Sequence, residues 1–211
     1  HFLRHREILQ PAEVHTRAAL AKDCARRFGA PVVIKASGLA AGKGVIVCQT
    51  LDEADRAIDD MLELNRFGAA GAEVLVEEFM EGEEVSIFAI TDGSSFVLLP
   101  ALQDHKRLHD GDLGPNTGGM GAYLPVTVPV TGQSDSNAVG QTVSLAEMAA
   151  RTIFAPTLRG LASRGRPFSG LLYAGLMITP TGPKVVEFNC RFGDPETEAL
   201  VLEVLADTGH S

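Results

Sequence analysis

Two lysines and a glycine-rich stretch near the start of the chain have the chemistry to bind phosphate groups. Lys35 ends the β-branched run Pro31–Ala36, where burial of its charge is costly without an anionic partner. Gly38–Gly44 follows as Gly-Leu-Ala-Ala-Gly-Lys-Gly, so backbone amides and Lys43 can close over phosphates. A plain glycine-rich hairpin, with Lys35 extending to solvent at a sheet edge, is the alternative.

The glycine-rich stretch differs from a mononucleotide-binding P-loop. A P-loop needs four residues between its glycines and a Ser or Thr after the lysine, which holds magnesium. Here three residues separate Gly38 from Gly42, and Gly44 follows Lys43. We therefore interpret the stretch as a mobile hairpin tip that covers phosphates.

Four polar residues near the other end of the chain have the chemistry to hold a metal ion and a charged substrate. Glu187 and Asn189 are two apart on a predicted strand, so their side chains leave the same face. Their oxygens suit Mg²⁺ bound with a nucleotide. Arg191 and Asp194 follow in a predicted loop, where the guanidinium can bind a carboxylate or phosphate. An ordinary strand end with polar tips is the alternative.

Six glutamates lie within residues 73–84, without a basic residue among them. Most members of such a charge run are normally solvated. A strand that leads into a turn with paired acids and an aromatic can also accept an adenine amino group and a ribose hydroxyl. The candidate nucleotide contacts are Glu77, Glu78, Phe79, Met80 and Glu84.

The segment from Gln103 to about Pro129 is predicted to be a functional loop, because ordinary connections are much shorter. It opens with the basic cluster Asp104–Arg107 and continues through Gly114–Gly121, whose small residues let a ligand approach the backbone. A solvated surface loop is the alternative. The candidate ligand contacts are Asp104, His105, Lys106 and Asn116.

Hydrophobic periodicity predicts the elements that position these residues. The predicted helices are 11–28, 52–64, 142–163 and one from about 196, and the predicted strands are 31–36, 45–48, 73–79, 85–91, 96–102, 170–178 and 183–189. Strands 85–91 and 96–102 flank an Asp-Gly turn typical of an antiparallel hairpin, and 131–141 is a predicted surface loop. We therefore expect an α+β fold rather than a doubly wound parallel sheet.

Composition narrows the class of protein. The 211 residues carry a net charge of −9, which disfavours nucleic acid as a partner. The three cysteines form no Cys-x-x-Cys pair, and no apolar run is long enough to span a bilayer. We expect a reducing, cytoplasmic location and no membrane partner. Because the chain opens without Met, we also expect it to be a segment of a longer protein.

Five motifs in the same order resemble the phosphoribosylamine-glycine ligase family, also called glycinamide ribonucleotide synthetase. The resemblance extends over roughly residues 1–205, and five motifs in register are far more specific than any one of them. The motifs are Ile34–Val45, Glu77–Glu84, Gln103–Arg107, Gly114–Tyr123 and Glu187–Glu196.

The resemblance implies an ATP-grasp fold, in which two α+β subdomains hold ATP between them. Residues 1–30 and 95–211 would form the main subdomain, and residues 31–94 a small lid subdomain with the glycine-rich loop. The implied reaction uses ATP to activate glycine as glycyl phosphate. The amine of 5-phosphoribosylamine then displaces phosphate, giving glycinamide ribonucleotide in purine synthesis.

The resemblance also implies roles for the candidate residues, with ATP and Mg²⁺ or Mn²⁺ as cofactors. Lys35 and Lys43 would neutralise phosphates, with Lys43 acting during phosphoryl transfer. The remaining implied roles are adenine contacts for Glu77–Met80, a ribose contact for Glu84, metal ligation by Glu187 and Asn189, and catalysis and substrate binding by Arg191 and Asp194, with Asp104, His105, Lys106 and Asn116 at the substrates.

The family carries an N-terminal domain for the phosphoribosyl substrate and a C-terminal domain, and neither is present in these 211 residues. We therefore expect nucleotide binding with little ligase turnover, in a parent chain that could be fused to other purine-synthesis domains. Two alternatives remain open. One is another ATP-grasp carboxylate-amine ligase, and the other is a non-catalytic ATP-binding module.

Overall fold

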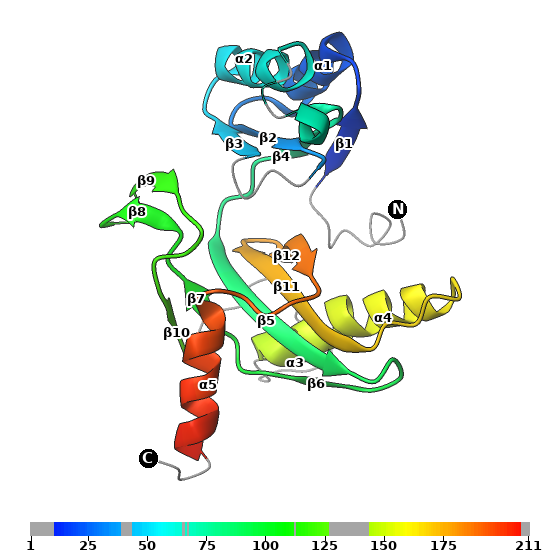
Figure 1. Ribbon diagram of the computed structural model, residues 1–211, viewed down its shortest axis with the longest axis vertical. Helices are drawn as coiled ribbons and strands as arrows, with labels where there is room; N and C mark the ends of the chain where they lie inside the picture. Colours follow the sequence, from blue (N-terminus) through cyan, green and yellow to red (C-terminus); the bar gives the residue numbers. More distant parts are fainter. Residues whose placement is uncertain are drawn as a thin grey trace. The chain divides into compact units, whose positions relative to one another are not determined.

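The computed structural model describes residues 11–38, 44–64, 66, 68–111, 113–126 and 144–207. The chain divides into two compact units (Figure 1). We call Gln10–Met80 the N-terminal unit and the unit that contains Glu81–Ser211 the C-terminal unit. Every strand pairing among the described residues is antiparallel, which agrees with the expected α+β class.

The N-terminal unit is a four-stranded sheet of order β1-β4-β2-β3, with α1 and α2 packed on one face (Figure 1). Its strands are β1 (Ala12–His15), β2 (Val32–Ala36), β3 (Val45–Cys48) and β4 (Val74–Glu78), and its helices are α1 (Ala18–Phe28), α2 (Leu51–Leu62) and a short 3-10 helix, η2 (Gly68–Gly71). The buried faces of α1, α2, β2 and β4 form its core. The strands predicted at 31–36, 45–48 and 73–79 and the helix at 52–64 are confirmed.

Helix α2 begins where the sequence supplies a capping residue. The Thr50 hydroxyl accepts a hydrogen bond from the Glu53 backbone N–H at 3.2 Å, and the Glu53 carboxylate accepts one from the Gln49 N–H at 2.7 Å. These bonds satisfy donors that the first helical turn leaves free. The cap and the acidic first turn fix the start of α2, which agrees with the helix predicted from periodicity.

The helix predicted over 11–28 is wrong in its first part. Residues Ala12–His15 form β1, which pairs with β4, and the helix begins only at Ala18. The apolar spacing in this stretch fits a helix, but the open edge of β4 offers the backbone a full ladder of hydrogen bonds. Tertiary pairing therefore overrides the local pattern.

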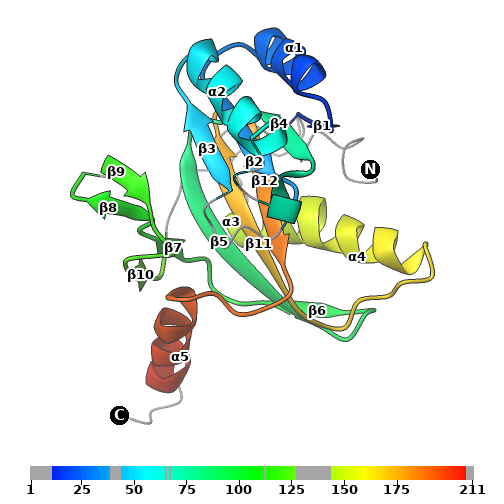
Figure 2. The ribbon, with the colours of Figure 1, turned by 45° about the horizontal axis from the view of Figure 1, so that its top comes forward.

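The C-terminal unit contains a second four-stranded sheet, of order β12-β11-β5-β6. Its elements are β5 (Glu83–Thr91), β6 (Phe96–Leu98), β7 (Gln103–Asp104), β8 (Arg107–His109), β9 (Leu113–Asn116), β10 (Ala122–Tyr123), α3 (Leu145–Ala149), a π-helical segment η3 (Ala150–Phe154), α4 (Ala155–Ala162), β11 (Gly170–Thr179), β12 (Gly182–Asn189) and α5 (Glu196–Asp207). Helices α3 and α4 cover one face of the sheet (Figure 2). The predicted strands 85–91, 170–178 and 183–189, the hairpin and the last two helices are confirmed.

The segment predicted as one long loop, 103–129, contains short strands. β7 pairs with β10, and β8 pairs with β9, in two antiparallel ribbons. Glycine and polar residues conceal these strands from a periodicity analysis, because their few pairs are held by loop hydrogen bonds and not by a buried apolar face. The predicted surface loop 131–141 lies outside the described residues.

The boundaries of the two compact units differ from those predicted for the subdomains. The compact units divide after Met80, and the N-terminal unit includes β1 and α1. The predicted lid, 31–94, omits those elements and includes β5, which lies in the other sheet. Among the described residues, no helix is long and apolar enough to cross a membrane.

The two faces of β5 differ in what covers them, and this yields a stability prediction. Ile87 is fully buried beneath α3 and α4, whereas Ile90, on the opposite face, is 50% exposed. We expect Ile87→Ala to lower the free energy of unfolding by about 2–5 kcal/mol through lost burial and a cavity. The matched Ile90→Ala should cost less than about 1.5 kcal/mol. Urea denaturation measures both, and equal losses would contradict this account of the core.

Candidate functional site

Strand β11 sets which side chains meet on the face of the C-terminal sheet that lies opposite α3 and α4. It pairs Tyr173 with Phe88 on one side and with Asn189 on the other. A register shift in β12 then places Glu187, and not Val186, opposite Gly175. Because neighbours in register share a face, Glu187 and Asn189 lie on the face opposite α3 and α4.

Glu187 and Asn189, which were predicted to bind a metal, lie side by side. Asn189 Nδ2 donates a hydrogen bond to Glu187 Oε1 at 3.1 Å, and Glu187 is exposed. The two side chains therefore lie together on one face of the sheet. Carboxylate and amide oxygens are hard donors of the kind that Mg²⁺ prefers.

Lys106, from the segment between β7 and β8, is surrounded by carboxylates. Its Nζ forms an ion pair with Glu84 Oε1 of β5. Burial, the largest single influence, would lower the pKa of Lys106, but the charge and hydrogen bond of Glu84 and the charges of Asp104 and Glu187 together raise it. Lys106 therefore stays charged and links the acids of β5, β7 and β12.

Asp104 has the most perturbed carboxyl group among the described residues with resolved pKa shifts. Burial raises the pKa of Asp104 to about 6. The Lys106 ammonium opposes the shift, whereas the charges of Glu196 and Glu84 add to it. A carboxyl group with a pKa near neutrality can exchange a proton with a bound substrate, and such groups concentrate at functional sites.

A buried hydrogen-bonded network lies behind this cluster. The Tyr173 hydroxyl donates to Glu196 Oε1 at 2.8 Å and lies 2.8 Å from the Ser86 hydroxyl. Glu196 and Ser86 are almost fully buried, and burial raises the pKa of Tyr173. The sequence pattern did not indicate Ser86 or Tyr173 as site residues. A tyrosine in an apolar strand was the available signal, since a buried hydroxyl needs a polar partner.

The remaining candidates of the C-terminal unit lie in two loops that touch. Gly119 adopts a φ of +126°, and a Cβ at this position would overlap the ring of Pro195, which follows Asp194. Arg191 and Asp194 are exposed, and the Arg191 guanidinium donates to the Phe192 carbonyl at 3.0 Å. The tight approach at Gly119 thus brings the glycine-rich loop and the loop after β12 together.

The ribbons hold the other predicted substrate residues. The His105 ring stacks on Tyr123 with centroids 5.5 Å apart, and the His105 N–H donates to the Gly121 carbonyl at 2.8 Å. Asn116 ends β9 beside Arg107, and its side chain lies outside the described part of the structure. Stacking and backbone pairing therefore order this segment, which sequence analysis had treated as a loop.

In the N-terminal unit, the predicted phosphate-binding lysine has a carboxylate partner. Lys35 Nζ lies 2.5 Å from Glu77 Oε2, and the two side chains are 18% and 7% exposed. Burial of Lys35 was expected to require an anionic partner. Glu77, which was predicted to contact adenine, is that partner. Lys43 falls outside the described residues. Glu78 and Phe79 are partly buried, and Met80 is buried.

Comparison with known proteins defines the class of this fold. The crystal structure of a phosphoribosylamine–glycine ligase from Thermotoga maritima shares 35% identity, with a TM-score of 0.81, over 95% of this chain and 48% of that chain. The biotin carboxylase domain of Hydrogenobacter thermophilus 2-oxoglutarate carboxylase, solved with MgADP, has a TM-score of 0.62 at 16% identity over 93% of this chain and 39% of that chain, a likeness of fold alone. The fold is that of the ATP-grasp class.

The family follows from sequence. The model of the phosphoribosylglycinamide synthetase ATP-grasp (A) domain matches residues 2–197, and the chain belongs to that family. A phosphoribosylamine–glycine ligase from Brucella melitensis is 53% identical over 193 residues, which are 90% of this chain and 42% of that protein. The chain therefore spans less than half the length of this curated relative.

The perturbed carboxyl of Asp104 predicts a specific pH dependence. Between about pH 4 and pH 6 the folded protein retains a proton on Asp104 that the unfolded chain has lost, so stability falls as the pH rises. Asp104→Asn removes the carboxyl group that titrates, and with it this fall in stability. The unfolding free energy of the variant relative to wild type should rise by about 1–2 kcal/mol across this range, allowing for partial solvent screening. Urea denaturation at pH 4 and pH 7 measures it.

Asp92→Asn is the matched control with the opposite sign. Hydrogen bonds from the Ser95 and Ser94 backbone N–H groups lower the pKa of Asp92. The stability that Asp92 contributes is therefore present above its unfolded pKa and is lost as the pH falls. The free energy of the Asp92→Asn variant relative to wild type should fall as the pH rises. A flat profile for Asp104→Asn would contradict the assignment of a raised pKa.

Proposed function

We propose that this chain is the ATP-grasp part of an enzyme that joins glycine to 5-phosphoribosylamine, with ATP converted to ADP and phosphate. The observation that carries the proposal is the 53% identity with the Brucella ligase over 193 residues. The acid cluster around Lys106 supports it, because it gathers oxygen donors, a fixed cation and a carboxyl group that titrates near neutrality. We further propose a cytoplasmic location.

The reaction balances in two steps. A carboxylate oxygen of glycine attacks the γ-phosphorus of ATP, and the bond from that phosphorus to the ADP oxygen breaks. The amine nitrogen of 5-phosphoribosylamine then attacks the carbonyl carbon of glycyl phosphate. Phosphate leaves with the electron pair of the C–O bond, and the nitrogen loses a proton.

Glu187 and Asn189 would hold the Mg²⁺ that accompanies ATP, or Mn²⁺ in its place. The fit rests on their adjacent positions, the exposure of Glu187 and the 3.1 Å contact that joins the two side chains. When bound, the metal neutralises developing charge on the phosphate oxygens. The biotin carboxylase domain of Hydrogenobacter thermophilus 2-oxoglutarate carboxylase, which shares this fold, was solved with MgADP, and this supports the pairing of nucleotide and magnesium.

Charged side chains of the C-terminal unit would act on the substrates. Lys106 would orient the glycine carboxylate while Glu84 and Asp104 balance its charge. Asp104, with its pKa of about 6, would accept the proton released by the attacking amine. Arg191 would stabilise the transferring phosphoryl group, and Asp194 would help to seat the amine.

Residues of the N-terminal unit would serve the nucleotide. Lys35 and Lys43 would carry positive charge to the phosphates, and the ion pair with Glu77 would hold Lys35 in place until phosphate arrives. Glu78, Phe79 and Met80 would line the adenine, largely through backbone groups. In the C-terminal unit, Glu84, at the start of β5, would bind the ribose. His105 and Asn116 would contact the phosphoribosyl substrate.

Removing the Glu187 carboxylate tests the metal assignment. Glu187→Ala should weaken Mg²⁺-dependent ATP binding by at least tenfold, since even the hydrogen-bond partners of metal ligands are worth about 10–100-fold in affinity. Glu198→Ala, an exposed glutamate of α5, is the matched control and should bind normally. Calorimetric titration with and without Mg²⁺ reports the difference. Unchanged metal dependence, with the circular dichroism spectrum intact, would remove Glu187 from the site.

Separating binding from turnover tests the proposed reaction. We expect the 211-residue chain to bind Mg-ATP but to form little glycinamide ribonucleotide from glycine and freshly generated 5-phosphoribosylamine, because the chain spans 42% of its curated relative. The full parent protein should form the product and ADP in equal amounts. If ADP forms only when a different amine is supplied, the protein is another ATP-grasp ligase. If the full parent protein binds Mg-ATP without turnover, it is a binding module.

A further inference from the structure

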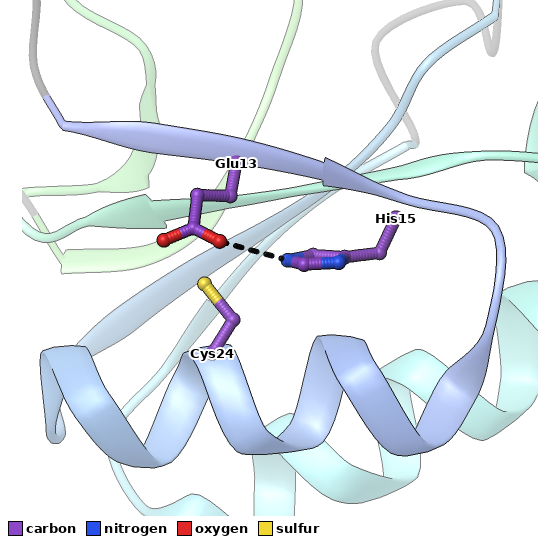
Figure 3. Close-up of side chains that lie close together, drawn as sticks. All are labelled: Glu13, His15 and Cys24. Atoms are coloured by element: carbon purple, nitrogen blue, oxygen red, sulfur yellow. Dashed lines mark ion pairs between the residues drawn. The ribbon is translucent and has the colours of Figure 1, made fainter.

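Three side chains of different chemistry meet in the N-terminal unit, on the face of its sheet that carries the helices (Figure 3). They are Glu13 and His15 of β1 and Cys24 of α1. Glu13 and His15 are paired with Val76 and Val74, which belong to the core beneath the helices. Lys35 and Glu77 occupy the alternate positions of their strands, on the opposite face. The cluster is therefore separated by the sheet from the residues assigned to the nucleotide.

The positions of these residues on β1 and α1 bring the three side chains together. Glu13 and His15 are two residues apart on β1, so both point toward α1, and α1 presents Cys24 to them (Figure 3). His15 Nε2 lies 3.5 Å from Glu13 Oε2. The carboxylate oxygen, the imidazole nitrogen and the thiol sulfur all lie within 4.8 Å of one another.

The imidazole nitrogen that points into the cluster is buried without a hydrogen bond. The His15 side chain is 13% exposed, and its Nε2 has no hydrogen-bond partner within the part of the chain that the structure describes. A buried polar atom left without a partner destabilises the folded protein, because it has lost its hydrogen bonds to water. An atom that accepts the Nε2 lone pair would remove this cost.

The cluster is closed on one side and open on the other. Cys24 is fully buried, whereas Glu13 is 45% exposed and borders solvent. Arg27 binds both oxygens of Glu13, at 2.8 and 2.9 Å, and its own side chain is 57% exposed. The guanidinium can therefore withdraw into water and release a carboxylate oxygen, and water can reach a fourth ligand position.

We propose that Glu13, His15 and Cys24 form a Zn²⁺ site with three protein ligands and one water. Zn²⁺ takes these three donor types at about 2.0–2.3 Å in tetrahedral geometry. The three donor atoms lie within 4.8 Å of one another, so they must move closer together to bind one Zn²⁺ ion. Thiolate and imidazole select zinc over magnesium, so this site is chemically distinct from the Glu187–Asn189 pair.

Metal binding changes the state of the thiol. Burial raises the pKa of Cys24 to about 11, and the Glu13 charge adds to the shift, so the sulfur carries its proton before a metal arrives. The thiolate is the form that ligates metal, and the proton leaves to solvent as Zn²⁺ binds. The Arg27 guanidinium opposes this rise in pKa and stays charged.

Cobalt substitution tests the proposal in the chelator-treated protein. Titration with Co²⁺ should give one equivalent of tetrahedral d–d absorption together with a thiolate-to-cobalt charge-transfer band, and Zn²⁺ should displace both. Zn²⁺ should also raise the midpoint of thermal unfolding, because it binds the folded state. Absence of the charge-transfer band, or of any shift with Zn²⁺, would overturn the site.

Matched variants identify the ligands. Cys24→Ala should abolish the charge-transfer band, whereas Cys48→Ala, which removes the other buried cysteine of the same unit, should leave it unchanged. His15→Gln should weaken Co²⁺ binding by at least tenfold, because losing even a hydrogen-bond partner of a metal ligand costs about 10–100-fold in affinity. Circular dichroism and Mg-ATP titration verify that each variant is folded. A band that persists in Cys24→Ala and disappears in Cys190→Ala would place the metal on the exposed cysteine and refute the proposal.

Discussion

The antiparallel register of β11 between β5 and β12 is the constraint on which the C-terminal unit depends. It places Ser86 and Glu187 on either side of Gly175, and Glu84 opposite Met177. A shift of one residue would turn every one of these side chains toward the helices. The buried apolar face under α3 and α4 prevents such a shift, because its valines, leucines and isoleucines would then face water.

With the register set, electrostatics decides how the polar face behaves. Lys106 and its surrounding carboxylates are partly withdrawn from water, so each charge depends on its neighbours. Asp104 receives less stabilisation from Lys106 than it loses by burial, which leaves it near its titration point. The network of Tyr173 and Glu196 beneath it is fully hydrogen-bonded, and such networks hold the groups above them rigidly.

The N-terminal unit separates two kinds of chemistry across a single sheet. One face carries the Lys35–Glu77 ion pair, and the helix-covered face carries the cluster of Glu13, His15 and Cys24. Period-two alternation along β1, β2 and β4 keeps them apart. The proposed zinc site and the proposed nucleotide contacts therefore lie on opposite faces of the same sheet.

Sequence patterns were sufficient for the fold class, for most helices and strands and for the Glu187–Asn189 pair, because these depend on local periodicity, caps and the same-face rule for alternate residues. They failed for β1 and for the ribbon of β7 and β10, whose partners lie far away in sequence, and for the short ribbon of β8 and β9, which has little apolar pattern. Likewise, only tertiary structure paired Lys35 with Glu77 and surrounded Lys106 with acids. Burial and proximity between residues far apart in sequence set these partnerships and the pKa of Asp104, and no local pattern encodes them.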